Sequence, residues 1–339
     1  MVRYLFSLQF IFAVQCFGIN NEAILSPKPE INLYEYALFQ DAQANLPDPN
    51  LVPYELITPL FSDYSDKERF VYVPKGKKAT FRANDVYQFP VGSVLVKTFS
   101  YTMKDGQKKK LETRLLLHQE AGWKAHTYVW NEAQDKALLK VAGYSFDDLN
   151  VLVDGNIKKV NYRTPNQNQC KECHLKQDAI SPIGPKSRNL NFTILYENTF
   201  EENQTDYWVN RGLVEAHEPV EAIANWLSQN ETLNDRARAY LDVNCGHCHM
   251  PGGSADTTNL FLNHTEDSAL RLGINKKPVA AGRASGNMQF SIEPGKPEES
   301  ILLYRMMSLD PGVMMPESGR QMNHSEGIDL IYEWITSLK

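Results

Sequence analysis

Two five-residue stretches of the chain each combine two cysteines with histidine, side chains that can bind a metal or react covalently. The first, "CKECH", runs from Cys170 to His174, and the second, "CGHCH", runs from Cys245 to His249. Both have the spacing Cys-x-x-Cys-His. With five cysteines and eight histidines in 339 residues, chance would place one such pentad in roughly 0.002 chains. The six residues of interest are therefore Cys170, Cys173, His174, Cys245, Cys248 and His249.

The spacing of each pentad is typical of the covalent attachment of haem. On a helical turn, residues i and i+3 share one face, so two thiols can each add to one vinyl group of a porphyrin. The histidine at i+4 can then bind the iron. The sequence predicts two c-type haems, with the four cysteines as attachment points and the two histidines as iron ligands.

Three other readings of the pentads carry less weight. A thioredoxin-like dithiol would need a strand before and a helix after it in a βαβ unit, and neither pentad has that context. A four-cysteine zinc site usually has pairs about 15 to 20 residues apart, whereas these pairs are about 70 residues apart. Disulfides are the third reading.

Amphipathic patterns predict helices at both ends of the second half of the chain. "NDRARAYLDVNCGHCH" has apolar residues at helical spacing that lead into the second pentad. "SEGIDLIYEWITSLK" has an apolar stripe and a candidate N-cap at Ser325. Two helices around one haem motif resemble the small mono-haem cytochrome c domain, and residues 229–339 would form it.

That resemblance implies a sixth iron ligand on a loop before the last helix. Such domains often have a Pro-Gly-x-Pro-x-x-Ser segment, here 294–300, followed by a Met-Pro loop, here Met315-Pro316. The implied axial pair is His249 and Met315, with Met314 as the alternative. His/Met ligation raises a reduction potential relative to two histidines. Met306 and Met307 are expected in a core, and His247 is expected at the surface or at a haem edge.

The region from 51 to 165 has a different pattern, with short alternating runs and turn signals that predict antiparallel strands. The predicted fold class is α+β, an N-terminal antiparallel β-rich domain followed by an all-α class I cytochrome c-like domain. The predicted divisions are a signal peptide at 1–18, an N-terminal extension at 19–50, the β-rich domain at 51–165, the first haem-attachment segment and linker at 166–228, and the cytochrome c domain at 229–339.

The sixth ligand of the first haem has several candidates. His126 would share a strand face with Tyr128 and Trp130, although a single histidine on a strand is usually structural. His118 and Met103 are further candidates, with His217 behind them. An iron with an open position is the remaining alternative.

The charge of the chain bears on its partners. The net charge of −6 argues against a nucleic-acid partner, and the basic run from Lys108 to Lys110 is expected in a solvated turn.

The first residues indicate the compartment. An apolar stretch from Tyr4 to Val14 is typical of a signal-peptide core, so an exported, periplasmic protein is expected. Cleavage after Gly18 is favoured over a lipid anchor at Cys16, and no later segment resembles a transmembrane helix.

The whole arrangement resembles an uncharacterised family of exported dihaem c-type cytochromes of Gram-negative bacteria. The stretches that carry the resemblance include "TPLFSDYSDKERFVYVPKG", "ETRLLLHQEAGWKAHTYVWNEAQ", "IGPKSRNLN" and "MMPESG", together with the pentads. It implies a dihaem protein that transfers single electrons between redox partner proteins. The alternatives are a peroxidase-like haem enzyme with an open first iron and a ligand-binding or sensor module.

Overall fold

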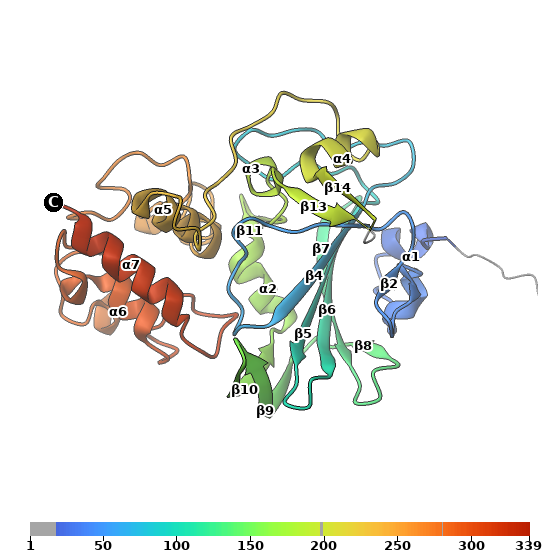
Figure 1. Ribbon diagram of the computed structural model, residues 1–339, viewed down its shortest axis with the longest axis horizontal. Coiled ribbons are helices and arrows are strands. Elements are labelled where there is room, and N and C mark those ends of the chain that lie inside the picture. The colour runs from blue at the N-terminus through green and yellow to red at the C-terminus, as the bar shows by residue number, and fades with distance from the viewer. Residues whose placement is uncertain (1–17, 197–198, 280) are drawn as a thin grey trace, which may run out of the picture.

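The largest element of the computed structural model is a six-stranded antiparallel sheet with the strand order β3-β4-β5-β6-β7-β8 (Figure 1). The structure describes residues 18–196, 199–279 and 281–339. The strands of this sheet are β3 (Val52–Pro53), β4 (Asp66–Tyr72), β5 (Val94–Thr102), β6 (Lys108–Gln119), β7 (Gly122–Trp130) and β8 (Ala137–Leu139). They come from the alternating runs of the sequence. Successive side chains of a strand point to opposite faces of the sheet, and each face packs against its own core.

One face of the sheet packs against residues 19–51. Phe70, Val96, Leu115 and Tyr128 lie in one buried cluster with side chains of this N-terminal segment. The Gln119 amide also donates to carbonyl oxygens there. The segment contains α1 (Asn21–Leu25), the 3-10 helix η1 (Leu33–Tyr36), β1 (Phe39–Asp41) and β2 (Leu46–Pro47). Residues 19–50 are therefore a layer of the folded unit.

The opposite face of the sheet is covered by two further clusters. The first surrounds the fully buried Trp208, and the second contains Phe99, Val151 and Tyr162. The elements on this side are β9 (Tyr144–Val153), β10 (Asn156–Thr164), α2 (Gln167–His174), β11 (Leu175–Lys176), β12 (Ala179–Ile180), α3 (Ser187–Leu190), β13 (Thr193–Tyr196), β14 (Phe200–Asn203) and α4 (Gln204–Asn210).

Residues 229–339 lie beside this β-rich part and have their own core (Figure 1). Leu241, Ile331 and Trp334 are buried there, where the first and last long helices contact each other. The helical elements are α5 (Leu233–Asn244), η2 (Asp256–Thr258), η3 (Gly282–Ser285), η4 (Pro297–Glu299), α6 (Ile301–Met307) and α7 (Ser325–Ser337).

The predicted fold class is wrong. The described chain is β-rich, with several two-stranded sheets besides the large one and only short helices, and residues 229–339 do not form an all-α class I cytochrome c-like domain. Between α5 and α6 the chain runs through turns, bends and 3-10 turns. The amphipathic pattern occurs only in the terminal helices, and the intervening segment is rich in Gly, Pro and Asn, which favour turns.

Two local predictions also need correction. Ser325 is the first residue of α7, and the N-cap is His324, which makes no capping hydrogen bond and stacks on Phe61 instead. The basic run belongs to strand β6, where Lys110 is buried against the face of Trp130. A long lysine stem can cross apolar surface while its ammonium finds carbonyl oxygens, here those of Ala42 and Gln43.

No helix in the described part of the chain is long and apolar enough to span a membrane. The prediction of a signal peptide at 1–18, and the lipid-anchor alternative at Cys16, fall almost wholly outside the described residues.

Candidate cofactor site at the two Cys-x-x-Cys-His motifs

The two pentads, far apart in sequence, lie side by side. The Cys248 thiol donates to the carbonyl oxygen of Glu172 at 3.3 Å, and the Ser254 hydroxyl donates to the same oxygen at 2.7 Å. Just beyond the pentads, the backbone N–H of Gln177 donates to the carbonyl oxygen of Gly252 at 2.9 Å. These contacts join α2 to the loop that follows α5.

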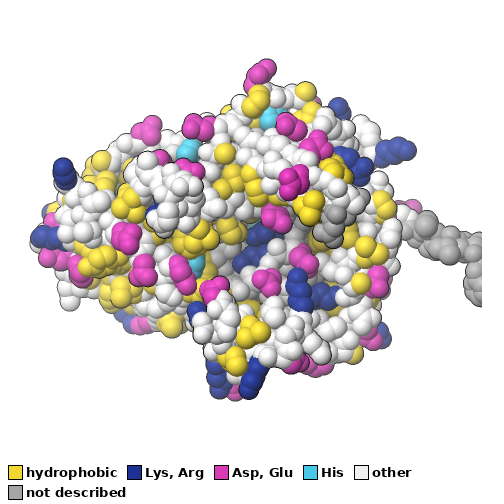
Figure 2. All heavy atoms as spheres, viewed as in Figure 1, with side chains coloured by type: hydrophobic (Ala, Val, Ile, Leu, Met, Phe, Trp, Pro, Cys, Tyr) yellow, Lys and Arg dark blue, Asp and Glu magenta, His cyan; other side chains and the backbone are white. Residues whose placement is uncertain are grey.

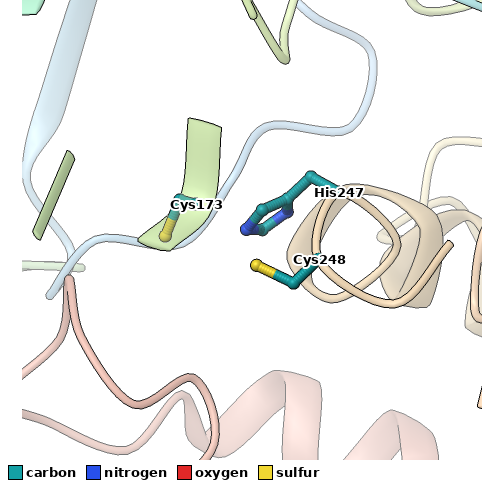
Figure 3. A group of neighbouring side chains, drawn as sticks. All are labelled: Cys173, His247 and Cys248. Carbon is teal, nitrogen blue, oxygen red and sulfur yellow. The ribbon is translucent and has the colours of Figure 1, made fainter. Parts of the chain in front are cut away.

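At the centre of this contact, Cys173, His247 and Cys248 point toward one another (Figure 3). One ligand atom from each side chain lies within 4.8 Å of the other two. In a hydrogen bond between the thiols, Cys173 donates to Cys248, which raises the pKa of Cys173 to about 12 and lowers that of Cys248. The separation of the two pentads in the sequence therefore does not prevent them from sharing a metal ion.

Each pentad begins on a helical turn. α2 starts with a capping box. The Asn166 side chain accepts a hydrogen bond from the backbone N–H of Gln169, and the Gln169 side chain accepts one from the backbone N–H of Asn166. The second pentad continues the last turn of α5, because the His249 amide donates to the carbonyl oxygen of Cys245 at 2.9 Å. Both local geometries give the i, i+3 and i+4 arrangement that the spacing predicts.

The two pentad histidines have the tautomer that a metal ligand needs. His174 donates from Nδ1 to the carbonyl oxygen of Ser181 at 2.8 Å, and His249 donates from Nδ1 to that of Leu260 at 3.3 Å. A carbonyl oxygen only accepts, so each Nε2 keeps its lone pair. Loss of solvation lowers the pKa of His174 to about 3 and that of His249 to about 4, so both imidazoles are neutral.

The second pentad borders a cavity of about 670 Å³. This volume lies within the range of about 300 to 1,000 Å³ that small-molecule sites occupy. Cys245, Cys248, His249 and Met315 all line it, whereas Met314 is buried outside it. Apolar residues of the lining include Leu260, Leu262, Ile301, Leu302 and Ile328. The donor set and the apolar walls fit a haem.

The first pentad borders a cavity of about 140 Å³, lined by Cys170, Cys173 and His174. It is smaller than a typical ligand site, but it adjoins the larger one. Residues that line both are Leu60, Cys173, His247, Ser318 and Gly319. At this pentad the chemistry of the thiols and the imidazole fits the attachment of a haem.

The candidates for the sixth ligand of the first haem do not gather around this cavity. His118 stacks on Trp123, Met103 packs in the cluster of Phe99, and His217 stacks on Phe81; none of these three described residues lines the cavity.

His126 borders the cavity but belongs to the other face of the sheet. It pairs with Leu115, whose side chain lies in the N-terminal cluster, while neighbouring Thr127 pairs with Arg114 on the cavity side. Because strand residues alternate between faces, the His126 imidazole is directed away from the pentad.

Of the two places expected for His247, the surface is wrong, and the edge of a haem stays a prediction. His247 is buried, at 9% exposure, and borders both cavities. Its Nδ1 donates to the carbonyl oxygen of Val243 at 3.2 Å, and the imidazole also hydrogen-bonds with Cys173 of the first pentad. The local sequence "CGHCH" does not predict that His247 lies beside Cys173, because that contact depends on a segment about 70 residues away.

Comparison with known proteins adds no relative. The chain matches no protein-family model, no curated protein and no solved structure.

Proposed function

We propose that this protein is an exported c-type cytochrome with two covalent haems, which passes single electrons between redox partner proteins. The observation that carries the proposal is the contact between two Cys-x-x-Cys-His turns, each bordering a cavity with a neutral histidine whose Nε2 is free. A bound haem accepts and releases one electron at its iron. Side-by-side attachment turns would keep two such groups within the reach of one another.

In this proposal the chain's own residues have separate tasks. Cys170 and Cys173 hold one group and Cys245 and Cys248 the other, through thioether bonds that prevent dissociation. His174 and His249 are the proximal ligands, oriented by the carbonyl oxygens that their Nδ1 atoms contact. Met315 would supply a thioether ligand at the larger cavity, which is lined in part by apolar residues such as Leu260 and Ile301.

A zinc-type centre at Cys173, His247 and Cys248 is the second candidate, because their ligand atoms converge. Zinc takes such Cys and His ligands. A zinc ion there would be bound by three residues. It would give no role to His174 and His249, although both have the tautomer of a metal ligand. The haem proposal accounts for all six pentad residues.

The first test is the cofactor content of the chain made in a bacterium that can attach haem to exported proteins. We expect a mass increase of two haems and a pyridine haemochrome spectrum with two thioether-linked haems per chain. The double variant Cys170→Ala/Cys173→Ala should retain one haem. Stoichiometric zinc without haem would instead establish the second candidate and refute the first.

The spectra of the purified protein separate an electron carrier from a peroxidase-like enzyme with an open first iron. His247, from the second pentad, borders the first cavity and offers a nitrogen donor there. A carrier with six-coordinate irons should be low-spin, and its spectrum should be unchanged within minutes of adding cyanide. A high-spin signal that disappears with cyanide would favour the enzyme.

A further inference from the structure

Three basic side chains form a row across the large sheet. Arg69 on β4 pairs directly with Lys97 on β5, and Lys97 pairs directly with Arg114 on β6. Directly opposed residues in a ladder have side chains on the same face, about 5 Å apart at Cβ. Like charges in that arrangement destabilise a sheet, so this cation row needs a physical reason.

The cation row faces the first pentad. Its three residues line the same cavity as Cys170 and His174. Arg69 is buried, and Lys97 and Arg114 are half-buried. Figure 2 shows basic side chains within a hollow near the middle of the molecule. The cation row therefore borders the cavity beside the first pentad.

Within the described residues, the cation row has too few anionic partners. Glu112 pairs with Arg114 and also accepts from the Tyr162 hydroxyl. Arg69 donates to the backbone carbonyl oxygen of Lys67 at 3.3 Å, and no ion pair is made by Arg69 or Lys97 in this part of the chain. The buried Nε of Arg114 has no hydrogen-bond partner. Among these three cations, only Arg114 has an ion-pair partner in the described part of the chain.

This imbalance has an energetic cost. Loss of solvation, followed by the charges of Arg114 and Arg69, lowers the pKa of Lys97 well below its usual value. Uncompensated charges are expensive to bury, and an anion with hydrogen-bonding oxygens offsets that cost.

We propose that the cation row of Arg69, Lys97 and Arg114 binds a pair of carboxylates, the two propionates of the haem held by Cys170 and Cys173. This inference rests on the proposed function. A haem carries two carboxylates on one edge, and Arg69 and Lys97 are the two cations of the row that make no ion pair among the described residues. Arginine binds carboxylates through two parallel hydrogen bonds. The cation row thus orients the first haem from the sheet side while His174 binds its iron.

The test compares Lys97→Gln with the wild-type dihaem protein. Removal of a positive charge beside one haem favours its oxidised form. We expect the reduction equilibrium constant of one haem to fall about tenfold, which is 59 mV for one electron, with the other haem unchanged. The propionate bending bands in the resonance Raman spectrum should shift, which a distant charge effect would not cause.

The matched variants keep the result interpretable. Lys97→Arg should restore the wild-type potential and bands, and Arg69→Gln offers a second removal of charge if Lys97→Gln does not fold. Lys108→Gln removes an exposed cation from β6 and should change neither. Unchanged potentials and bands in a variant with two haems would overturn this inference alone.

The remaining outcomes concern the source of the anion. Wild-type protein without haem would refute the proposed function and this inference with it. If inorganic phosphate shifts the wild-type spectrum and Lys97→Gln removes that shift, the cation row binds a free oxyanion, and the propionate assignment is wrong. Insensitivity of the wild type to phosphate supports occupied propionate contacts.

Discussion

Met315→Ala is expected to lower the reduction potential of one haem and to leave the other unchanged. A thioether ligand favours ferrous iron, so its loss should shift the reduction equilibrium by about tenfold or more, ~59 mV for one electron. Met315 borders the larger cavity with His249, so the haem at the second pentad should respond. Spectroelectrochemical titration measures both potentials.

Met314→Ala is the matched control for this experiment. Met314 is buried at 5% exposure but does not line the cavity. Its truncation should cost about 2 to 5 kcal/mol of folding free energy and should not change either potential. If Met314→Ala lowers a potential while Met315→Ala does not, the axial assignment belongs to Met314.

Asp242→Asn is expected to reduce the free energy of unfolding by about 3 to 5 kcal/mol, because it removes one partner of a buried ion pair. Asp242 lies on α5 and contacts Arg188 at 2.9 Å and Lys186 at 3.5 Å. It also accepts from the His264 amide at 2.9 Å. The variant would leave Arg188 buried without its carboxylate, at the contact between α5 and α3. Urea unfolding at neutral pH measures the loss.

The pH dependence of this effect follows from the pKa of Asp242. Burial alone would raise that pKa, but Lys186 and Arg188 outweigh burial and hold the pKa at about 2. In the unfolded chain it is about 3.9. The carboxylate therefore stabilises the fold above about pH 4, and this contribution, about 2 to 3 kcal/mol, disappears as the pH falls from about 4 through about 2.

The matched control is an exposed pair. Glu132, with a side chain that is 83% exposed, pairs with Lys109, and Glu132→Gln should change stability by less than about 1 kcal/mol. The difference in stability between wild type and Asp242→Asn should shrink as the pH falls below 4. A constant difference down to pH 2 would mean that the ionised carboxylate is not what stabilises this contact.

The features that depend on local spacing could be predicted from the amino-acid sequence alone. The two pentads, the amphipathic patterns that became α5 and α7, and the alternating runs that became β4 to β7 could be read directly. Each depends on residues within one or two turns, or within one strand. The same local reasoning overextended the helical pattern to all of 229–339, because two terminal helices do not constrain the segment between them.

Contacts between residues far apart in the sequence could not be predicted and depend on how the chain folds. His247 faces Cys173, and Arg69, Lys97 and Arg114 form one row, because of how separate strands and loops pair and pack. Strand register also directed His126 away from the first pentad, since a shift of one residue reverses the face of every side chain. Packing between segments far apart in the chain sets these contacts, and no local pattern encodes them.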